Sequence, residues 1–259
     1  MSGAARWTDL WPRLMSGIVL IVVGAVEIWL GGVPFAALVC VLAGAMIWEA
    51  ARMFAAPDAL RSGVLAAVAV ALALWLPGIM VLPILLAAVV VASRSVERER
   101  GPFFALAIWS LLGCYAMGTL RAEAGLIWVL WLVAVVVISD VAGYFAGRSL
   151  GGPKFWPRYS PKKTWSGTIA GWIGAAGVGL IFAAPTGAGL ALVPLSVLVS
   201  FAGQMGDIAE SAVKRLRGVK DSSNLIPGHG GVLDRFDAML GAALVVVILW
   251  AVGLLPGVA

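Results

Sequence analysis

The side chains that could carry out chemistry are concentrated between residues 204 and 237, in a chain that is otherwise strongly apolar. This segment contains the only histidine, His229, and ten charged residues, whereas the other 225 residues share 21 charged side chains. Charged groups are costly near a lipid bilayer, so their presence there indicates a function. Carboxylates can hold a divalent cation and Lys or Arg can bind phosphate, so this mixture indicates metal-assisted chemistry on an anionic substrate.

The polar residues of this segment are spaced so that they share helix faces. Four of them recur at i, i+3, i+4 and i+7 and therefore line one side of a helix: Asp207, Glu210, Ser211 and Lys214. Two further acids, Asp234 and Asp237, repeat at i+3 and share a face at the start of the next helix. If the two faces meet, their carboxylates form a metal site. The alternative is that these acids only neutralise neighbouring cations, such as Arg235 beside Asp237.

A glycine-rich turn separates the two helices. Residues 227–231 read Pro-Gly-His-Gly-Gly, and the missing side chains would let backbone N–H groups approach phosphate oxygens. His229 is not required as a general base, because a phosphate monoester is already dianionic near neutral pH. We expect His229 to hydrogen-bond a phosphate or to make a structural contact within its loop.

A second polar segment runs from Ile138 to Gly167. Asp140 lies one to two turns inside an apolar run, so it must face protein, water or a cation. Gly143 and Gly147, at i+4 spacing, predict a close helix–helix contact. The following loop carries four cations among Gly and Pro residues and is expected to be a flexible phosphate-binding segment: Lys154, Arg158, Lys162 and Lys163.

The elements that position these residues are membrane-spanning helices. The chain of 259 residues is 62% hydrophobic and 12% charged with a mean hydropathy of +1.02, which excludes a soluble globular protein. Nine apolar runs are long enough to be spans, which predicts an all-α polytopic membrane protein: residues 14–30, 33–50, 63–76, 77–92, 103–119, 125–147, 168–184, 190–210 and 232–256. The third and fourth runs are short and could instead form one hairpin that does not fully cross.

The distribution of basic residues predicts the orientation of these spans. With the N-terminus in the cytoplasm, seventeen of the eighteen Lys and Arg residues fall on the inner side and only Arg121 falls outside. We therefore predict an inner (cell) membrane protein with its N-terminus and its active site in the cytoplasm. The whole chain, 1–259, is expected to be one membrane domain, in which residues 1–120 form N-terminal helices and 121–259 the catalytic half.

Two acids interrupt the N-terminal helices. Glu49 stands three residues before Arg52, so a helix-terminal ion pair is its simplest role, with a remote substrate role as the alternative. Glu27 is expected to reach toward the outer surface.

Both polar segments resemble the phosphatidate cytidylyltransferase (CDP-diacylglycerol synthase) family. Its signature, S-x-x-K-R-x4-K-D-x4-[aliphatic]-P-G-H-G-G-x-x-D-R-x-D, matches from Ser211 to Asp237 at every specified position. A second stretch, S-D-x-x-A-Y-F-x-G-R followed by S-P-K-K-T-x-E-G, matches closely between Ser139 and Gly167. This chain departs from the family at three places: Ser166 replaces a glutamate, Gly143 and Tyr144 replace the usual Ala-Tyr order, and Ser223 replaces a common glycine.

The resemblance implies a magnesium-dependent nucleotidyltransferase that converts CTP and phosphatidic acid to CDP-diacylglycerol and pyrophosphate in phospholipid biosynthesis. It implies metal ligation by Asp207 and Asp234, with Asp221 and Asp237 as weaker candidates, and leaves open whether a second metal or a monovalent cation takes part. With Asp207, Asp234 and Asp221, the expected catalytic groups are Lys214, Lys220 and Arg235. The expected substrate-binding residues are Asp140, Tyr144, Ser160, Lys162, Lys163, Thr164, Ser211, Arg215, Gly228, His229, Gly230 and Gly231.

The implied partners are CTP, phosphatidic acid and membrane lipid, with a homodimer suggested by the family and no nucleic acid. Two other functions stay open on the sequence. One is a cytidylyltransferase for another lipid phosphate, which an assay of lipid preference would separate. The other is a lipid or anion transporter, which would also use intramembrane acids and broken helices but would not need phosphate-binding charge on one face only.

Overall fold

The computed structural model describes residues 10–257, and they are almost entirely helical. The chain is 77% helical, which confirms an all-α membrane architecture at the level of fold class. Nine α-helices in the described range coincide with the nine apolar runs: α2 (Leu10–Leu30), α3 (Gly32–Met53), α4 (Ala59–Trp75), α5 (Val81–Arg94), α6 (Arg100–Thr119), α7 (Leu126–Ser149), α8 (Trp165–Phe182), α9 (Leu192–Leu216) and α10 (Leu233–Ala251). Arg6, one of the cations counted on the inner side, lies outside the described residues.

Within residues 10–257, six helical segments are long and apolar enough to cross a membrane, which supports an integral membrane protein. They are Arg13–Leu30, Gly32–Met53, Arg100–Ala124, Leu126–Ser149, Trp165–Phe182 and Gly189–Leu216. Helix α4 has 17 residues and α5 has 14. At 1.5 Å per residue α5 is about 21 Å long, shorter than the ~30 Å hydrocarbon core of a bilayer. Nine full crossings therefore remain a prediction.

Glycine and proline residues mark several of the breaks between helices. Gly31 adopts φ 62° between α2 and α3, and Gly125 adopts φ 88° before α7, a left-handed conformation that favours glycine. Gly125 ends a π-helical turn, η2 (Leu120–Ala124). Between α4 and α5, Leu76 and Pro77 are extended and lead into the 3₁₀ turn η1 (Gly78–Met80), as the sequence predicted. A second 3₁₀ turn, η3 (Gly189–Ala191), precedes α9.

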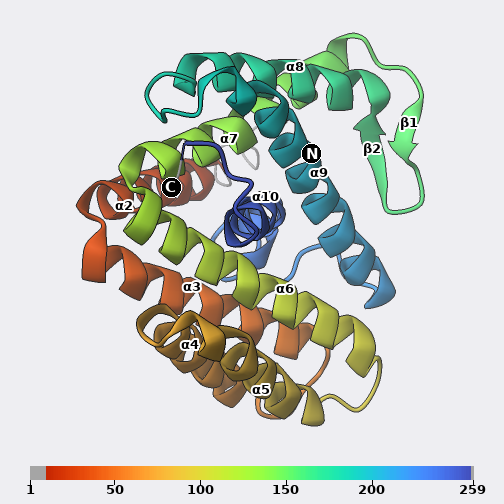
Figure 1. Cartoon of the computed structure of the whole chain (residues 1–259). Coiled ribbons are helices and arrows are strands. Elements are labelled where there is room, and N and C mark those ends of the chain that lie inside the picture. The colour runs from red at the N-terminus through yellow and green to blue at the C-terminus, as the bar shows by residue number, and fades with distance from the viewer. Residues whose placement is uncertain (1–9, 258–259) are drawn as a thin grey trace. The chain divides into compact units, whose positions relative to one another are not determined.

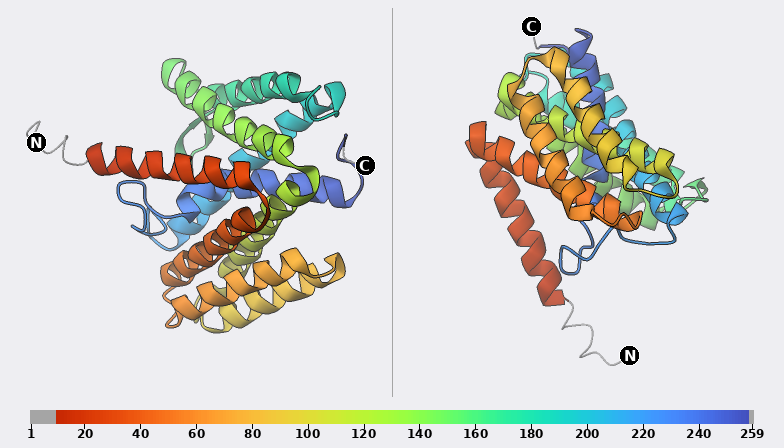
Figure 2. Two further views of the ribbon diagram at one scale, coloured as in Figure 1. Left: turned by 90° about the vertical axis from the view of Figure 1, so that its left-hand side faces the viewer. Right: turned by 90° about the horizontal axis from the view of Figure 1, so that it is seen from below.

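The described chain divides into two compact units, each discontinuous in sequence. The first unit contains the residues up to Leu111 together with Arg217–Phe236, and the second contains Leu112–Leu216 and the residues from Asp237 onward. In the first unit α3, α4 and α5 lie side by side (Figure 1). Helix α2 diverges from α3 at their junction, as both views of Figure 2 show, and its apolar side chains are largely exposed.

The second unit is built on α7, α8 and α9, which pack against one another (Figure 1). Buried polar side chains join these helices. Trp131 Nε1 donates to Ser196 Oγ across 2.9 Å, and the hydroxyls of Ser139 and Ser200 are 2.7 Å apart. Gln204 Nε2 then donates to Ser139 Oγ across 3.3 Å. Because lipid tails are as apolar as the side chains they face, such interhelical hydrogen bonds help to determine how membrane helices associate.

The cationic loop between α7 and α8 is more ordered than the sequence indicated. It forms an antiparallel hairpin of β1 (Lys154–Trp156) and β2 (Ser160–Thr164), with Lys154 opposite Thr164 and Trp156 opposite Ser160. The prediction of a flexible loop is therefore wrong at this position. Hairpin pairing fixes the strand that carries Lys162 and Lys163.

Candidate active site

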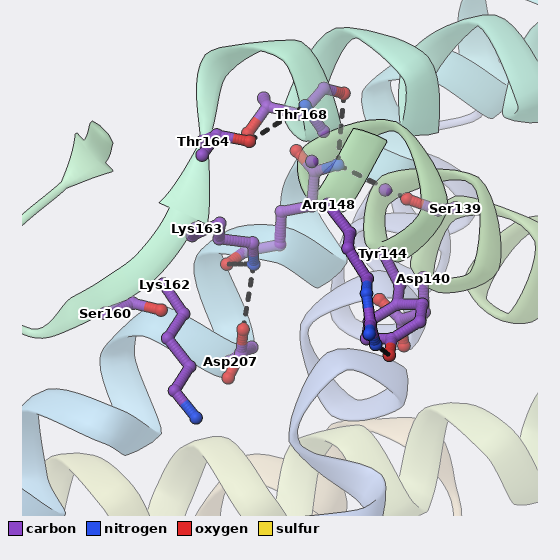
Figure 3. A pocket seen from close by; sticks show the side chains of 14 residues that line it. Ser139, Asp140, Tyr144, Arg148, Ser160, Lys162, Lys163, Thr164, Thr168 and Asp207 are labelled. Atoms are coloured by element: carbon purple, nitrogen blue, oxygen red, sulfur yellow. Dashed lines mark hydrogen bonds and ion pairs between the residues drawn. The ribbon is translucent and has the colours of Figure 1, made fainter. Parts of the chain in front are cut away.

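A pocket of about 490 Å³ opens in the second unit, between α7, β2, α8 and α9. Its volume is within the range of about 300–1,000 Å³ that is typical of small-molecule sites. Six of the residues expected to bind substrate line it, and so does the expected metal ligand Asp207. The lining residues are Ser139, Asp140, Gly143, Tyr144, Gly147, Arg148, Ser160, Lys162, Lys163, Thr164, Gly167, Thr168, Gln204 and Asp207 (Figure 3).

The charged side chains of the pocket come from three elements. Lys162 and Lys163 extend from β2, Asp207 comes from α9, and Arg148 comes from the end of α7 (Figure 3). Lys163 Nζ lies 2.8 Å from Asp207 Oδ2 and 3.2 Å from the carbonyl oxygen of Gln204. Arg148 Nη1 donates to the Tyr144 hydroxyl across 2.7 Å. Three cations therefore line the pocket, which makes it suited to an anionic ligand.

Close backbone contact between α7 and α8 shapes the wall of the pocket. A Cβ atom at Gly167 would lie 2.6 Å from the carbonyl oxygen of Gly143, and one at Gly147 would lie 2.9 Å from Thr164 Oγ1. These contacts confirm that Gly143 and Gly147 form a close packing surface. Thr164 is the N-cap of α8, because its Oγ1 accepts a hydrogen bond from the Gly167 N–H across 3.2 Å.

Ser166, which stands where the family has a glutamate, has a structural role in this chain. Its Oγ donates to the carbonyl oxygen of Gly151 across 2.5 Å and lies 3.0 Å from Thr164 Oγ1. The hydroxyl thus joins the loop that precedes β1 to the first turn of α8. An ionised glutamate has no donor and cannot make the bond to Gly151.

Sequence reasoning missed two residues at the buried end of the pocket, Thr168 and Gln204. Both are buried, and Thr168 Oγ1 has no hydrogen-bond partner among the described residues. Gln204 accepts a hydrogen bond at Oε1 from Trp172 Nε1 across 3.1 Å and donates from Nε2 to the carbonyl oxygen of Thr168 across 3.3 Å. Their position in the sequence could have revealed them, because each is a polar residue inside an apolar run and lies about one helical turn from a predicted site residue. Thr168 follows Thr164 by four residues, and Gln204 precedes Asp207 by three.

The glycine-rich part of the signature lies in the first unit, where Asp234 organises it. Asp234 Oδ2 accepts hydrogen bonds from the backbone N–H groups of Ser222 and Gly231, both across 2.8 Å, and from Ser222 Oγ across 2.9 Å. A Cβ atom on Gly230 would lie 2.9 Å from Asp234 Oδ2 and 3.4 Å from Asp221 Cβ, so Asp221 and Asp234 flank the same glycine. The N–H of Gly231 is therefore already used within the loop.

His229 makes the structural contact that was one of its two expected roles. Its Nδ1 lies 2.8 Å from the hydroxyl of Ser16 on α2, and the same hydroxyl donates to the Pro227 carbonyl oxygen across 2.9 Å. When Ser16 donates to Pro227, the His229 Nδ1–H is the donor to Ser16 Oγ. The backbone N–H of His229 donates to the Ile226 carbonyl oxygen across 2.9 Å. Phosphate binding by this residue stays a prediction.

The expected ion pair between Glu49 and Arg52 is not formed. The Arg52 guanidinium lies over the Trp48 ring, 4.9 Å from its centroid. Both oxygens of the fully buried Glu49 accept hydrogen bonds from residues 217–233, the signature loop. The i+3 spacing allowed the pair, but the loop supplies donors inside the protein that outweigh an exposed cation. At the other end of this loop, Arg217 Nη1 donates to Glu99 Oε2 across 2.6 Å and its guanidinium lies over Phe54.

The remaining predicted residues do not line the pocket. Glu210 and Lys214 form a buried ion pair at i+4 on α9, on the shared face that the spacing predicted. Ser211 is half-buried on the same helix, while Arg215, Lys220, Asp221, Gly228 and Arg235 are exposed. Asp237 Oδ1 accepts the N–H of Ala238 across 2.7 Å on α10. Among residues 10–257, no three His, Cys, Asp or Glu side chains come together as a ready-made metal cluster.

The acids nevertheless form two groups, one in each unit. In the second unit the carboxylates of Asp140, Asp207 and Asp237 are near enough for their charges to interact. In the first unit Asp221 and Asp234 flank Gly230. A single metal site that combines Asp207 with Asp234 stays a prediction.

Comparison with known proteins agrees with these motifs. Residues 11–252 match the profile described as the cytidylyltransferase family. A phosphatidate cytidylyltransferase of Brucella suis is 49% identical over 134 residues, which cover 50% of this chain and 49% of that protein. Proteins of the same name from Bacillus subtilis and Helicobacter pylori are 40% identical over 121 residues and 39% identical over 135 residues, covering 45% and 50% of their own lengths.

Each of these alignments spans about half the length of the curated relative. The family profile, in contrast, extends from α2 to the end of α10 and includes both the pocket and the signature loop. The chain belongs to the cytidylyltransferase family.

Proposed function

We propose that this chain is a magnesium-dependent phosphatidate cytidylyltransferase, which forms CDP-diacylglycerol and pyrophosphate from CTP and phosphatidic acid. The observation that carries the proposal is the pocket that Lys162, Lys163, Arg148 and Asp207 line together, within a chain of the cytidylyltransferase family. The names of the relatives supply the substrates.

The charge of the pocket fits the charge of these substrates. CTP and a lipid phosphate monoester together carry about six negative charges near neutral pH. Lys162 and Arg148 offer donors at the rim of the pocket, and Lys163 is held beside Asp207 and the Gln204 carbonyl oxygen. These cations would neutralise the triphosphate and orient the lipid phosphate.

The carboxylates also fit a hard divalent cation. Asp207 already forms an ion pair with the Lys163 ammonium, and Asp140 and Asp237 are two further carboxyl groups in the same unit. Carboxylate oxygens are the ligands that Mg²⁺ prefers, and a bound Mg²⁺ would stabilise charge on the attacking and leaving oxygens. We propose Asp207 and Asp234 as the principal ligands and Asp221 and Asp237 as further candidates.

The residues of the pocket then have distinct tasks. A phosphate oxygen of phosphatidic acid attacks the α-phosphorus of CTP and forms a new P–O bond. The bond between the α-phosphorus and the oxygen that bridges to the β-phosphorus breaks, and pyrophosphate leaves. No proton has to be removed first, because the lipid phosphate is dianionic. The lysines of β2 hold the phosphates in line, while the hydroxyls of Ser160, Thr164 and Thr168 offer hydrogen bonds within the pocket.

We also propose that this site faces the cytoplasm of an inner-membrane protein. Seventeen of eighteen Lys and Arg residues fall on one side of the predicted spans. CTP is soluble and phosphatidic acid is a membrane lipid, so they can meet only at the membrane surface.

The test is an assay of purified protein with radiolabelled CTP, Mg²⁺ and phosphatidic acid in mixed micelles. We expect a labelled, lipid-soluble product, pyrophosphate release and loss of both on chelation of the metal. Parallel reactions should contain an ether-linked isoprenoid phosphate and a diacylglycerol without phosphate. Preference for the isoprenoid phosphate would replace phosphatidic acid as the proposed substrate. Label transfer to neither of the two lipid phosphates would overturn the proposed function.

A further inference from the structure

A buried carboxylate on α3 holds the signature loop from inside the protein. Glu49 is fully buried, and its two oxygens lie within hydrogen-bond distance of four donors that are 173 to 184 residues away in the sequence. Oε1 accepts from the Val232 N–H across 2.8 Å and from Ser223 Oγ across 2.6 Å. Oε2 accepts from the Leu233 N–H across 2.8 Å and lies 3.2 Å from Ser222 Oγ.

Two of these donors are the N–H groups of the residue before α10 and of its first residue. Helix α10 begins at Leu233, so the N–H groups of Val232 and Leu233 have no acceptor within the helix. A carboxylate at a helix N-terminus satisfies such groups and interacts favourably with the helix dipole. Glu49 therefore fixes the point at which the loop becomes α10, one residue before Asp234.

Glu49 and Asp234 hold the same short segment from two sides. Ser222 Oγ is 2.9 Å from Asp234 Oδ2 and 3.2 Å from Glu49 Oε2. A serine hydroxyl has one hydrogen, so it donates to one of these carboxylates at a time. The two acids are thus coupled through Ser222.

The position of Glu49 also explains a glycine of the signature. A Cβ atom on Gly231 would lie 2.6 Å from Glu49 Oε1. Any other residue would need the carboxylate to move and would disturb its hydrogen bonds to the loop. Gly231 is therefore required by packing against Glu49 and against Ser222 Oγ, which the added Cβ would overlap.

We propose that Glu49 is a positioning residue of the reaction: it fixes the segment from Ser222 to Leu233 and, through it, the orientation of the Asp234 carboxylate. The inference rests on the proposed function because Asp234 is there a metal ligand. It adds a residue outside both polar segments of the sequence and gives Ser223, a departure from the family pattern, the role of an additional donor.

Glu49→Gln is the sharpest variant because it keeps the shape of the side chain. The amide nitrogen cannot accept a hydrogen bond, so two of the four donors lose their acceptor on residue 49 whichever way the amide is turned. Glu97→Gln is the matched control, since Glu97 is exposed in the same unit. Glu49→Asp keeps the charge but shortens the reach and should fall between wild type and Glu49→Gln.

The first readout is hydrogen–deuterium exchange of the full chain in detergent, which requires no activity. In Glu49→Gln we expect exchange of peptides covering residues 222–234 to rise about tenfold or more, while peptides of α4 and α5 keep the wild-type rate. Unchanged exchange at 222–234 would show that Glu49 does not hold the loop. If Glu49→Gln unfolds throughout, Ser222→Ala with Ser223→Ala replaces it, with a smaller rise expected in the same peptides and its absence counting against the proposal.

The second readout is turnover of CTP with phosphatidic acid. We expect kcat of Glu49→Gln to fall about tenfold or more, with a smaller change in KM for CTP, while Glu97→Gln behaves as wild type. Faster exchange with an unchanged kcat would overturn the positioning role. If wild type shows no turnover, the proposed function fails, and the exchange experiment still decides whether Glu49 holds the loop.

Discussion

The ammonium group of Lys163 lies 2.8 Å from Asp207 Oδ2, so a strand residue and a helix residue 44 positions apart form the charged centre of the pocket. The side chains are 18% and 38% exposed, so both can be reached by a ligand from solvent. Asp207 is thereby oriented before any substrate arrives, because Lys163 also donates to the carbonyl oxygen of Gln204 on α9.

We expect Asp207→Asn to abolish most of the activity while the protein still folds and inserts. The amide keeps the size of the side chain but removes the charge that attracts Lys163 and, in the proposed mechanism, a divalent cation. Loss of one such electrostatic group should lower kcat by about 100-fold or more. Asp58→Asn, at an exposed position before α4, is the control. Wild-type turnover of Asp207→Asn at ordinary Mg²⁺ concentrations would remove Asp207 from the mechanism.

Replacing both Lys162 and Lys163 with alanine should weaken catalysis, with kcat lowered and KM for CTP raised. Each lysine lines the pocket, and a charged contact to phosphate is worth about tenfold. Arg94→Ala with Arg98→Ala removes the same charge from exposed positions outside the pocket and should leave steady-state kinetics nearly unchanged. Equal and small losses in the two double variants would mean that the β1–β2 hairpin takes no part in binding.

Two glycines of α8 should respond oppositely to substitution by alanine. At Gly167 the new Cβ would lie 2.6 Å from the Gly143 carbonyl oxygen, so Gly167→Ala should separate α7 from α8 and destabilise the protein by about 1–3 kcal/mol. At Gly177 nothing lies within 4 Å, so Gly177→Ala should stabilise the helix by about 0.5–1 kcal/mol. Thermal unfolding in detergent measures both, and equal shifts would contradict the close contact.

The orientation can be tested with single cysteines on either side of α9. In a background with Cys40 and Cys114 replaced by alanine, Pro185→Cys and Asn224→Cys introduce thiols at exposed loop positions. We expect a membrane-impermeant maleimide to label position 185 in intact cells, but position 224 only after permeabilisation. The opposite labelling pattern would place the signature loop on the outer side of the membrane, away from cytoplasmic CTP.

Hydrophobic runs predicted the helices well because helix placement in such a chain depends on local composition. The nine apolar runs coincide with α2 to α10, and the break at Leu76–Gly78 falls where Pro and Gly predicted it. The packing surface of Gly143 and Gly147 was also predicted, since small residues at i+4 spacing mark such surfaces, but its partner Gly167 was not.

The missed features depend on partners that are distant in sequence. For Glu49 the sequence offered only the i+3 spacing to Arg52, whereas its hydrogen-bond donors come from residues 222–233. The hairpin of β1 and β2 joins two short polar segments without hydrophobic alternation, so the period-2 signal of a strand was absent. Thr168 and Gln204 were overlooked because charge drew attention to their neighbours.

The hydroxyl, indole and amide contacts between α7 and α9 fix the heights of the two helices relative to each other. Trp131 bonds Ser196, and Ser139 contacts both Ser200 and Gln204, so polar contacts occur at two levels along these helices. If α9 slid along α7, indole and hydroxyl groups would be left unsatisfied in an apolar medium, at about 0.6–2 kcal/mol per contact. Because Asp207 follows Gln204 by one turn, its height relative to Asp140 is set by these contacts. The two carboxyl groups of the pocket would then keep their spacing whatever the thickness of the surrounding bilayer.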